Sequence, residues 1–286
     1  MPRTPMPDLV SVHGGHSGEF CSHAKDTLEA IIQAYVRRNF RWVGITEHMP
    51  PLNDAFLYIE ERETGLNSRK SFDRFSTYVE TCRRLREKYA SSIKIFVGFE
   101  TEWYTGSADL VHRLVDQFEP DYIVGSLHHV DDILIDGKPE LFWRAVETLG
   151  SVEALYCRYF DQQLELINAL RPSVIGHFDL IRMHDPDYAM RWDIPEIQWR
   201  IRRNLKRIKE LELILDFNVA ALRKGALEPY ISRPILLQAL DLGISVVPGD
   251  DSHGVDSVGL QVEEGIKILL DAGFTGQWAK PVVTRS

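Results

Sequence analysis

The feature that most constrains the fold is the regular alternation of short apolar runs with longer amphipathic stretches along 286 residues. Seven runs have the length and composition of buried strands: residues 9–13, 42–46, 94–99, 122–126, 173–175, 213–217 and 244–248. The stretches between and after them carry apolar residues at helical spacing: 27–39, 72–89, 108–118, 141–169, 194–211, 234–242 and 262–272. Strands that alternate with helices predict an α/β fold around a parallel sheet, either closed or open.

The composition supports one globular unit. Hydrophobic residues make up 44% and charged residues 26% of the chain, which excludes a disordered, collagen-like or coiled-coil protein. We find no linker, low-complexity segment or composition shift, so we expect a single domain over residues 1–286. Residues 50–71 form a long polar segment, which would be either a lid over a site or a solvated excursion.

Cysteine usage and charge indicate the compartment and the partners. Cys21, Cys82 and Cys157 are far apart and odd in number, which favours a reducing cytosol over a disulfide framework. Residues 1–12 lack the apolar core of a signal peptide, and no apolar run is long enough to cross a membrane. We therefore expect a cytoplasmic protein that is not bound to membranes. The net charge of -9 argues weakly against nucleic acid as a partner, and the oligomeric state stays open.

Side chains that can bind metals follow every predicted strand. In chain order they are His13, His16 and His23; Glu47 and His48; Glu100 and Glu102; His128 and His129; His177 and Asp179; Asp216 and Asn218; and Asp250, Asp251 and His253. Because the C-terminal ends of parallel strands open onto one face, these side chains should converge there. A single such residue after a strand is usually a solvated loop residue or a satisfied core group. A metal-binding residue type after all seven predicted strands favours a metal site.

The mixture of donors predicts the chemistry. Imidazole together with carboxylate suits Zn, Mn or Fe rather than Ca or Mg alone. About nine ligands exceed the coordination sphere of one ion, so we expect two or three divalent ions, with Glu100 able to bridge two of them. Metals about 3.5–4 Å apart can generate a bridging hydroxide and stabilise an in-line phosphoryl transition state.

Together these motifs resemble the PHP (polymerase and histidinol phosphatase) superfamily, and most closely its histidinol-phosphate phosphatase branch. The matching segments are H-S-G-E-F-C-S-H-A-K-D-T-L-E, G-I-T-E-H, G-F-E-T-E-W, G-S-L-H-H, G-S-V-E-A-L-Y-C-R-Y-F, V-I-G-H-F-D-L, L-D-F-N-V-A-A-L-R-K and G-D-D-S-H. The resemblance implies a distorted (β/α)7 barrel with three metals at the C-terminal ends of its strands. It also implies hydrolysis of L-histidinol phosphate to L-histidinol and phosphate, a late step of histidine biosynthesis.

The resemblance also assigns ligands. One metal would be held by His13, His16, Glu100 and Asp251; a second by Glu100, His128 and His177; a third by His23, His48 and His253. Glu100, Asp251 and His253 would be catalytic. A metal-bridging hydroxide would attack phosphorus directly, and the donor of the proton to the leaving alkoxide stays open between a metal-bound water and Asp251.

One departure from the family pattern concerns the first strand. The family opens with H-x-H, whereas here the spacing is H-x-x-H, and Gly14 stands where the first His would be. Residues three apart on a regular strand point to opposite faces. Either a bulge at Gly14 and Gly15 re-aims His13, or His13 only caps the strand and the first metal has one ligand fewer. His16 is the stronger candidate.

Cations and carboxylates near the strand ends are candidates for binding substrate. Arg223 and Lys224 follow the sixth strand and Arg182 follows the fifth, where they could grip a phosphate. The alternative is that they are solvated surface charges. Glu47 and Glu102 could face the ammonium and imidazole groups of histidinol phosphate, although Glu102 could equally support a ligand.

Four neighbours of the candidate ligands have a supporting role in this interpretation. His129 is expected to point away from the metals, and Asp250 and Asp179 to support other groups. Cys21 could be a soft ligand, but a small buried thiol is the preferred interpretation.

Two alternative functions remain. One is another PHP-type phosphoesterase that acts on nucleotides or oligonucleotides, and the other is a catalytically silent metal-binding module.

Overall fold

A seven-stranded, all-parallel sheet forms the centre of the computed structural model, which describes residues 7–281. Its strands follow one another in chain order. They are β1 (Val10–Gly14), β2 (Trp42–His48), β3 (Lys94–Thr101), β4 (Tyr122–Gly125), β7 (Val174–Ile175), β8 (Ile214–Asn218) and β9 (Ser245–Gly249). Each overlaps one of the seven predicted apolar runs, because strands buried on both faces stand out as continuous apolar segments.

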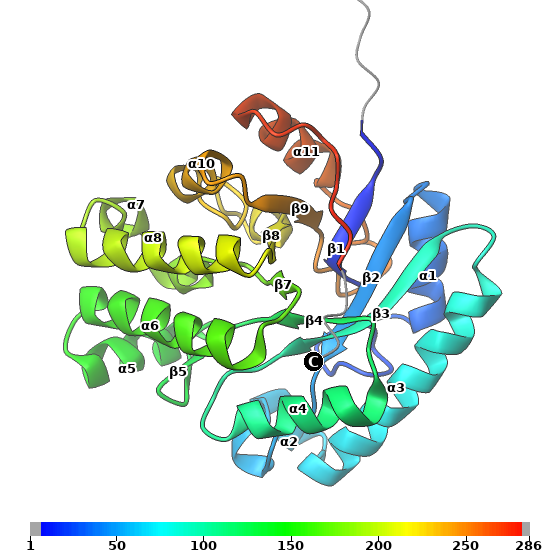
Figure 1. Cartoon of the computed structure of the whole chain (residues 1–286). Coiled ribbons are helices and arrows are strands. Elements are labelled where there is room, and N and C mark those ends of the chain that lie inside the picture. Colours follow the sequence, from blue (N-terminus) through cyan, green and yellow to red (C-terminus); the bar gives the residue numbers. More distant parts are fainter. Residues whose placement is uncertain (1–6, 282–286) are drawn as a thin grey trace, which may run out of the picture.

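The sheet curls until its two edges meet. The backbone N–H of Asp251, just after β9, donates to the carbonyl of His13 in β1 over 2.9 Å, and that of His16 donates to the carbonyl of Ser252 over 2.8 Å. Figure 1 shows the strands at the centre and the helices outside them. The predicted distorted (β/α)7 barrel is therefore confirmed.

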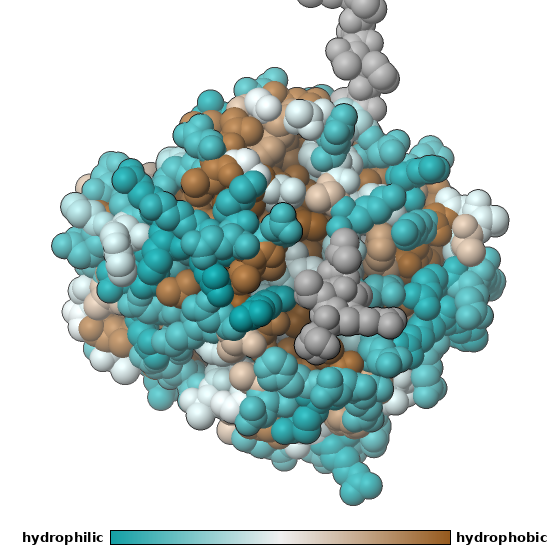
Figure 2. Space-filling model, viewed as in Figure 1, coloured by the Kyte–Doolittle hydropathy of each residue, from teal (hydrophilic) through white to brown (hydrophobic). Residues whose placement is uncertain are grey.

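The helices surround the barrel and follow the predicted amphipathic stretches. The longer ones are α1 (Leu28–Arg37), α3 (Ser68–Lys88), α4 (Ser107–Phe118), α5 (Pro139–Leu149), α6 (Val152–Leu170), α8 (Pro195–Glu210), α10 (Arg233–Asp241) and α11 (Val262–Ala272). The amphipathic stretch 141–169 forms two helices rather than one, because α5 ends at Leu149, Gly150 after it adopts φ 92°, and Ser151 caps α6. On the face shown in Figure 2, hydrophilic side chains predominate, with apolar ones visible between them.

The interior of the barrel is apolar toward the N-terminal ends of the strands. Val12, Phe96 and Tyr122 are buried together there. The Tyr122 hydroxyl crosses from β4 and donates to the Val12 carbonyl over 2.5 Å. A Cβ on Gly44 of β2 would lie only 1.6 Å from that hydroxyl oxygen, so a glycine is required for this crossing. The filled end leaves the C-terminal end as the place where polar groups meet.

Residues 50–71 pack against that polar end. They include a 3-10 turn, Asp54–Phe56, and the short helix α2 (Ile59–Glu63). The ring of Phe56 stacks on that of Tyr104 at 3.8 Å between centroids, and the Tyr58 hydroxyl donates to Glu102 over 2.9 Å.

Within residues 7–281, none of the helices combines the length and the apolar character that a membrane-spanning segment needs.

The crossing of Tyr122 under Gly44 yields a stability prediction. We expect Gly44→Ala to lower the free energy of unfolding by about 1–3 kcal/mol, because the added methyl overlaps the tyrosine hydroxyl. Thermal and denaturant unfolding of the purified protein would measure it. In a Tyr122→Phe background the same substitution should cost less, and an unchanged unfolding midpoint in the single variant would contradict this account of the barrel interior.

Candidate metal centre

The register of two neighbouring strands places the first pair of candidate ligands side by side. In the β2–β3 ladder His48 is paired with Glu100, at the point where both strands reach the C-terminal end of the barrel. Their side chains approach to 3.1 Å between Nδ1 and Oε2. This pairing brings two predicted ligands together.

Glu100 lies at the centre of the cluster. Its Oε1 is 2.9 Å from Nε2 of His177 and 3.3 Å from Nε2 of His128, and its Oε2 is 3.4 Å from Nε2 of His13. These histidines come from the ends of β7, β4 and β1, and the Glu100 side chain is only 2% exposed. One carboxylate thus faces imidazoles from several strand ends, as expected for a group that bridges metals.

An irregularity in β1 turns His13 into the same cluster. The β1–β2 register shifts between Ser11 and Gly14, and Gly15 adopts φ 72°. The His13 ring is completely buried, and its Nδ1 lies 3.0 Å from Asp216 Oδ2 while Nε2 faces Glu100. The irregularity lies between Ser11 and Gly14, just before the predicted position at Gly14 and Gly15, and His13 faces Glu100; its role as a metal ligand stays a prediction.

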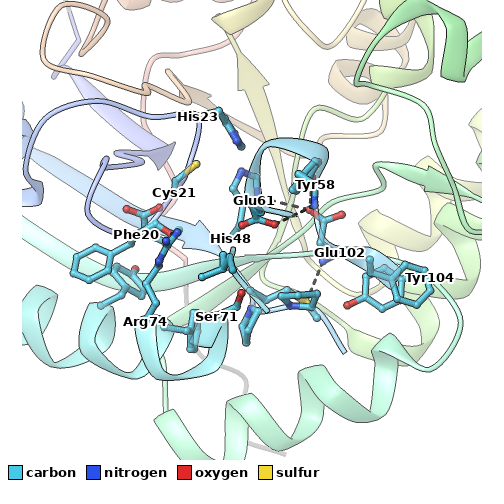
Figure 3. A pocket seen from close by; sticks show the side chains of 18 residues that line it. Phe20, Cys21, His23, His48, Tyr58, Glu61, Ser71, Arg74, Glu102 and Tyr104 are labelled. Carbon is cyan, nitrogen blue, oxygen red and sulfur yellow. Dashed lines mark hydrogen bonds and ion pairs between the residues drawn. The ribbon is translucent and has the colours of Figure 1, made fainter. Parts of the chain in front are cut away.

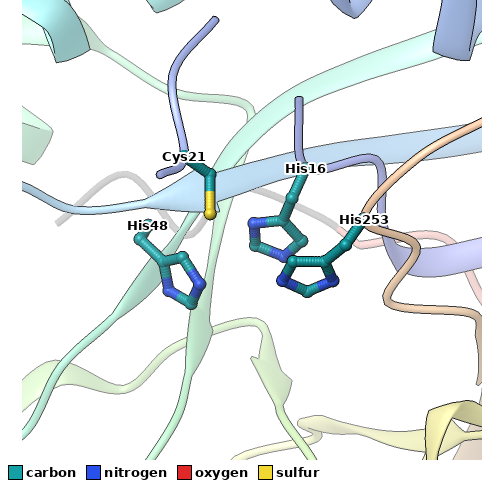
Figure 4. Close-up of side chains that lie close together, drawn as sticks. All are labelled: His16, Cys21, His48 and His253. Carbon is teal, nitrogen blue, oxygen red and sulfur yellow. The ribbon is translucent and has the colours of Figure 1, made fainter. Parts of the chain in front are cut away.

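Three histidines and a cysteine form a second group. Ligand atoms of His16, Cys21, His48 and His253 lie within 4.8 Å of one another. Figure 4 shows these four side chains close together. His16 also places Nε2 at 3.3 Å from Asp251 Oδ1. The sulfur of Cys21 therefore points into the site, which gives weight to the soft-ligand alternative for this residue.

His23 lies beside that group. Its ring stacks on His253 at 4.9 Å and lies 5.4 Å from His48, between centroids. Unlike the others, it is solvent exposed. The three histidines predicted for a third metal are thus neighbours, with His23 on the outside.

Buried carboxylates contact the outer nitrogens of the histidines predicted to be ligands. Glu102 Oε2 is 2.9 Å from Nδ1 of His128, and Glu47 Oε2 is 3.5 Å from Nδ1 of His16. Such contacts orient an imidazole so that its other nitrogen faces the metal. Figure 3 shows Glu102 joined to Tyr58 on the wall of a small pocket beside His48, and Glu47 accepts hydrogen bonds from Ser17. Neither Glu47 nor Glu102 lines the cavity of about 390 Å³ above the cluster. Both carboxylates therefore lie behind the histidines and not on the wall where the sequence analysis expected them to face a substrate.

The other neighbours behave as supports. Asp250 accepts hydrogen bonds from Ser11, Tyr35 and the Gly259 N–H, and so holds the loop that carries Asp251. His129 is buried at 3.4 Å from Glu102 and packs edge-on against Phe56 and Tyr104, away from the cluster.

The electrostatics reflect how tightly the groups are packed. Burial alone would raise the pKa of Glu100, but the surrounding histidines, His13 first, hold it well below its usual range. Burial lowers the pKa of His16, yet the neighbouring carboxylates of Asp251 and Glu47, at 3.3 and 3.5 Å from its ring nitrogens, outweigh burial and raise it to about 9. Burial and the neighbouring His16 lower the pKa of His48 to about 3, which keeps its ring neutral. A neutral imidazole is the form that binds a metal.

The donor atoms fit divalent metal ions. Among the described residues, the Nε2 atom of His13 and both ring nitrogens of His16 and His48 are buried without a hydrogen-bond partner. Buried polar atoms without partners are costly, and coordination would relieve that cost. The charge and donor types of the cluster therefore fit metal binding, and the number of ions stays a prediction.

A cavity of about 390 Å³ opens over the cluster. Among the residues that line it are His23, His48, Glu100, His128, His177, Asp251 and His253, together with Arg223, Lys224, Tyr58, Glu60, Asp136 and Tyr230. Two nitrogens of Arg223 donate to the carbonyls of Asp250 and Asp251, which fixes the guanidinium at the cavity wall.

Arg182 does not line this cavity. It is buried and paired with Asp179 at 3.2 Å, and it donates to the carbonyls of Glu228 and Pro229. These contacts use the guanidinium to hold a loop, so the structure does not place Arg182 where it could bind a phosphate.

The comparisons with known proteins agree with this geometry. The family model described as "PHP domain" matches residues 14–220, more than half of the chain. The chain belongs to the PHP family. A Schizosaccharomyces pombe protein named "Probable histidinol-phosphatase" is 37% identical over 93% of this chain and 87% of its own length. The "Histidinol-phosphatase" of Saccharomyces cerevisiae is 28% identical over 91% of this chain and 88% of its own length.

Two solved structures share the barrel of this PHP protein. A candidate histidinol phosphatase from Listeria monocytogenes has a TM-score of 0.76 and 26% identity, over 88% of this chain and 97% of that one. Histidinol phosphate phosphatase from Lactococcus lactis, solved with Zn, L-histidinol and phosphate, has a TM-score of 0.73 and 17% identity, over 97% of each chain.

Sequence reasoning did not name several residues of this PHP protein that line the cavity, among them Tyr58, Glu60, Asp136 and Tyr230. Asp136 and Tyr58 belong to connecting segments rather than strand ends, and no spacing rule pointed to them. Asp216 was noted only as a possible ligand, whereas its carboxylate contacts the outer nitrogen of His13.

The position of His13 is directly testable by metal analysis. We expect His13→Ala to lower the metal content of the purified protein by about one ion per chain, because it removes one imidazole from the Glu100 cluster. His112→Ala, on the exposed face of α4, is the matched control and should keep the full content. Equal metal content in the two variants would show that His13 is not a ligand.

Proposed function

We propose that this chain is a metal-dependent phosphomonoesterase that hydrolyses L-histidinol phosphate to L-histidinol and phosphate, in histidine biosynthesis. The observation that carries the proposal is the Glu100 cluster with Arg223 and Lys224 on the wall of the same cavity. The names of the yeast relatives and the ligands of the Lactococcus lactis protein support this substrate.

The metal ligands follow from the contacts. We assign one ion to His13, His16, Glu100 and Asp251, and a second to Glu100, His128 and His177. A third ion would be held by His48 and His253, with His16, His23 and Cys21 close by. Zinc fits the Lactococcus lactis structure, and the same donors also accept Mn and Fe.

Bound ions would supply a nucleophile at neutral pH and stabilise the charge that develops on the phosphoryl oxygens. The protein's own contribution is orientation. Glu47, Glu102 and Asp216 hold the ligand histidines, and Arg223 and Lys224 present cations to the phosphate. Two carbonyls fix Arg223 at the cavity wall, and its remaining N–H groups would be available to the phosphate with little further ordering. We assign catalytic roles to Glu100, Asp251 and His253.

Three further assignments belong to this proposal. We treat residues 1–286 as one domain, because one apolar cluster contains residues from Leu28 to Leu269. Residues 50–71 would act as a lid, since Tyr58 contacts Glu102 and lines the cavity. The cytosol is the proposed location, in keeping with the free thiols of Cys21, Cys82 and Cys157.

A parallel substrate panel tests the function. Phosphate release is measured from L-histidinol phosphate, a nucleoside monophosphate and a dinucleotide, with and without a chelator. We expect turnover of the first only, and its loss on chelation. His177→Ala should remove most of this activity, because the variant loses an imidazole that contacts Glu100.

Turnover of either nucleotide with none of histidinol phosphate would establish the nucleotide phosphoesterase instead. Fewer than two ions per chain, with no hydrolysis of these substrates or of an aryl phosphate, would indicate a silent metal-binding module.

A further inference from the structure

A short hairpin after β4 carries an acidic side chain back over the metal cluster. Strands β5 (His129–Val130) and β6 (Ile133–Leu134) pair antiparallel, and the Ile135 N–H donates to the His128 carbonyl over 2.8 Å. The buried Ile135 anchors the returning strand. The next residue, Asp136, therefore lies at the cavity wall next to His128.

The carboxylate of Asp136 has His128 as its ion-pair partner, with no Lys or Arg beside it among the described residues. Its side chain is only 20% exposed, and its Oδ2 lies 4.0 Å from Nε2 of His128. Its Oδ1 is buried without a hydrogen-bond partner among residues 7–281, and within that range no Lys or Arg forms an ion pair with it. By contrast, the buried Asp179 and Asp185 are paired with Arg182 and Arg191.

No Lys or Arg pairs with this half-buried carboxylate among residues 7–281, so a cationic group of a bound ligand would add to the charge that His128 already brings near it. The same cavity already has its cations for phosphate at Arg223 and Lys224, which come from the segment after β8. The cavity wall therefore has positive groups after β8 and negative groups on other sides, at Asp136 after β4, beside the metal cluster, and at Glu60 in α2. A substrate with both an anionic and a cationic group would be oriented by them.

We propose that Asp136 is a specificity-determining residue that accepts hydrogen bonds from the ammonium group of the substrate. The inference rests on the proposed function. In histidinol phosphate the ammonium is on the carbon next to the ester methylene, so it stays close to phosphorus, whereas the imidazole extends farther out. A carboxylate 4.0 Å from a ligand histidine is placed for the nearer of these two groups.

The test compares two substrates that differ only in the ammonium. They are L-histidinol phosphate and its deamino analogue, 3-(imidazol-4-yl)propyl phosphate. For Asp136→Asn we expect kcat/KM for histidinol phosphate to fall about 30- to 100-fold, mainly through KM, because a charge-assisted hydrogen bond is lost. The analogue should change less than about threefold, since it never made that bond. Asp136→Glu should restore part of the preference for the ammonium substrate.

Asp132→Asn is the matched control, because it removes the same charge from the same hairpin. Asp132 is exposed, accepts a hydrogen bond from the Thr105 N–H and does not line the cavity. This variant should keep the wild-type ratio of the two substrates. Metal content and the unfolding midpoint of Asp136→Asn should also match those of the wild type.

Two results would overturn the assignment. Equal losses on both substrates would show that Asp136 acts on the metals or on the phosphoryl group, and an unchanged ratio without loss would show that it does not contact the ammonium. Failure of the wild type to hydrolyse histidinol phosphate is a separate result, which would contradict the proposed function itself.

Discussion

The contacts of the Glu100 carboxylate with imidazoles from different strands are the interaction on which the site depends. Glu100 is buried, and His13, His48, His128 and His177 all approach it within 3.4 Å. Parallel strands that all end at one face bring together residues so distant in sequence. The closing contacts between β1 and β9 matter for the same reason, because they fix His13 and Asp251 against each other.

Burying so many charged and polar side chains at one end of the barrel costs free energy of folding, and the surrounding residues reduce this cost. Charged and polar atoms gather at one end of the barrel, while the other end is filled by apolar side chains and the crossing Tyr122. Carboxylates behind the cluster, such as Glu47 and Glu102, hold the histidines and balance positive charge. The division separates the part of the barrel that stabilises the fold from the part that binds ligands.

Much of this could be predicted from the sequence, because strand ends and ligand types are local features. The seven strands and the convergence of His16, His48, Glu100, His177 and Asp251 follow from apolar runs and the residues after them. The orientation of side chains could not be predicted in the same way. The direction of the His13 side chain, for example, depends on the register irregularity in β1.

Other differences arise from tertiary contacts, which no local pattern reveals. Arg182 follows a strand, as Arg223 does, yet it pairs with Asp179 and turns away from the cavity. Asp136 reaches the site only through the fold of a hairpin. The break at Gly150 was hidden because apolar periodicity continues on both sides of it.

The central claim is that Glu100 joins two metal ions at the end of the barrel. The most direct measurement is anomalous X-ray diffraction from crystals of the purified protein, collected at the absorption edge of the metal found in it. The account predicts two peaks that share the Glu100 carboxylate, each about 2.0–2.2 Å from one of its oxygens if the metal is zinc. Metal peaks that lie away from Glu100, or a single peak that does not involve it, would contradict the account.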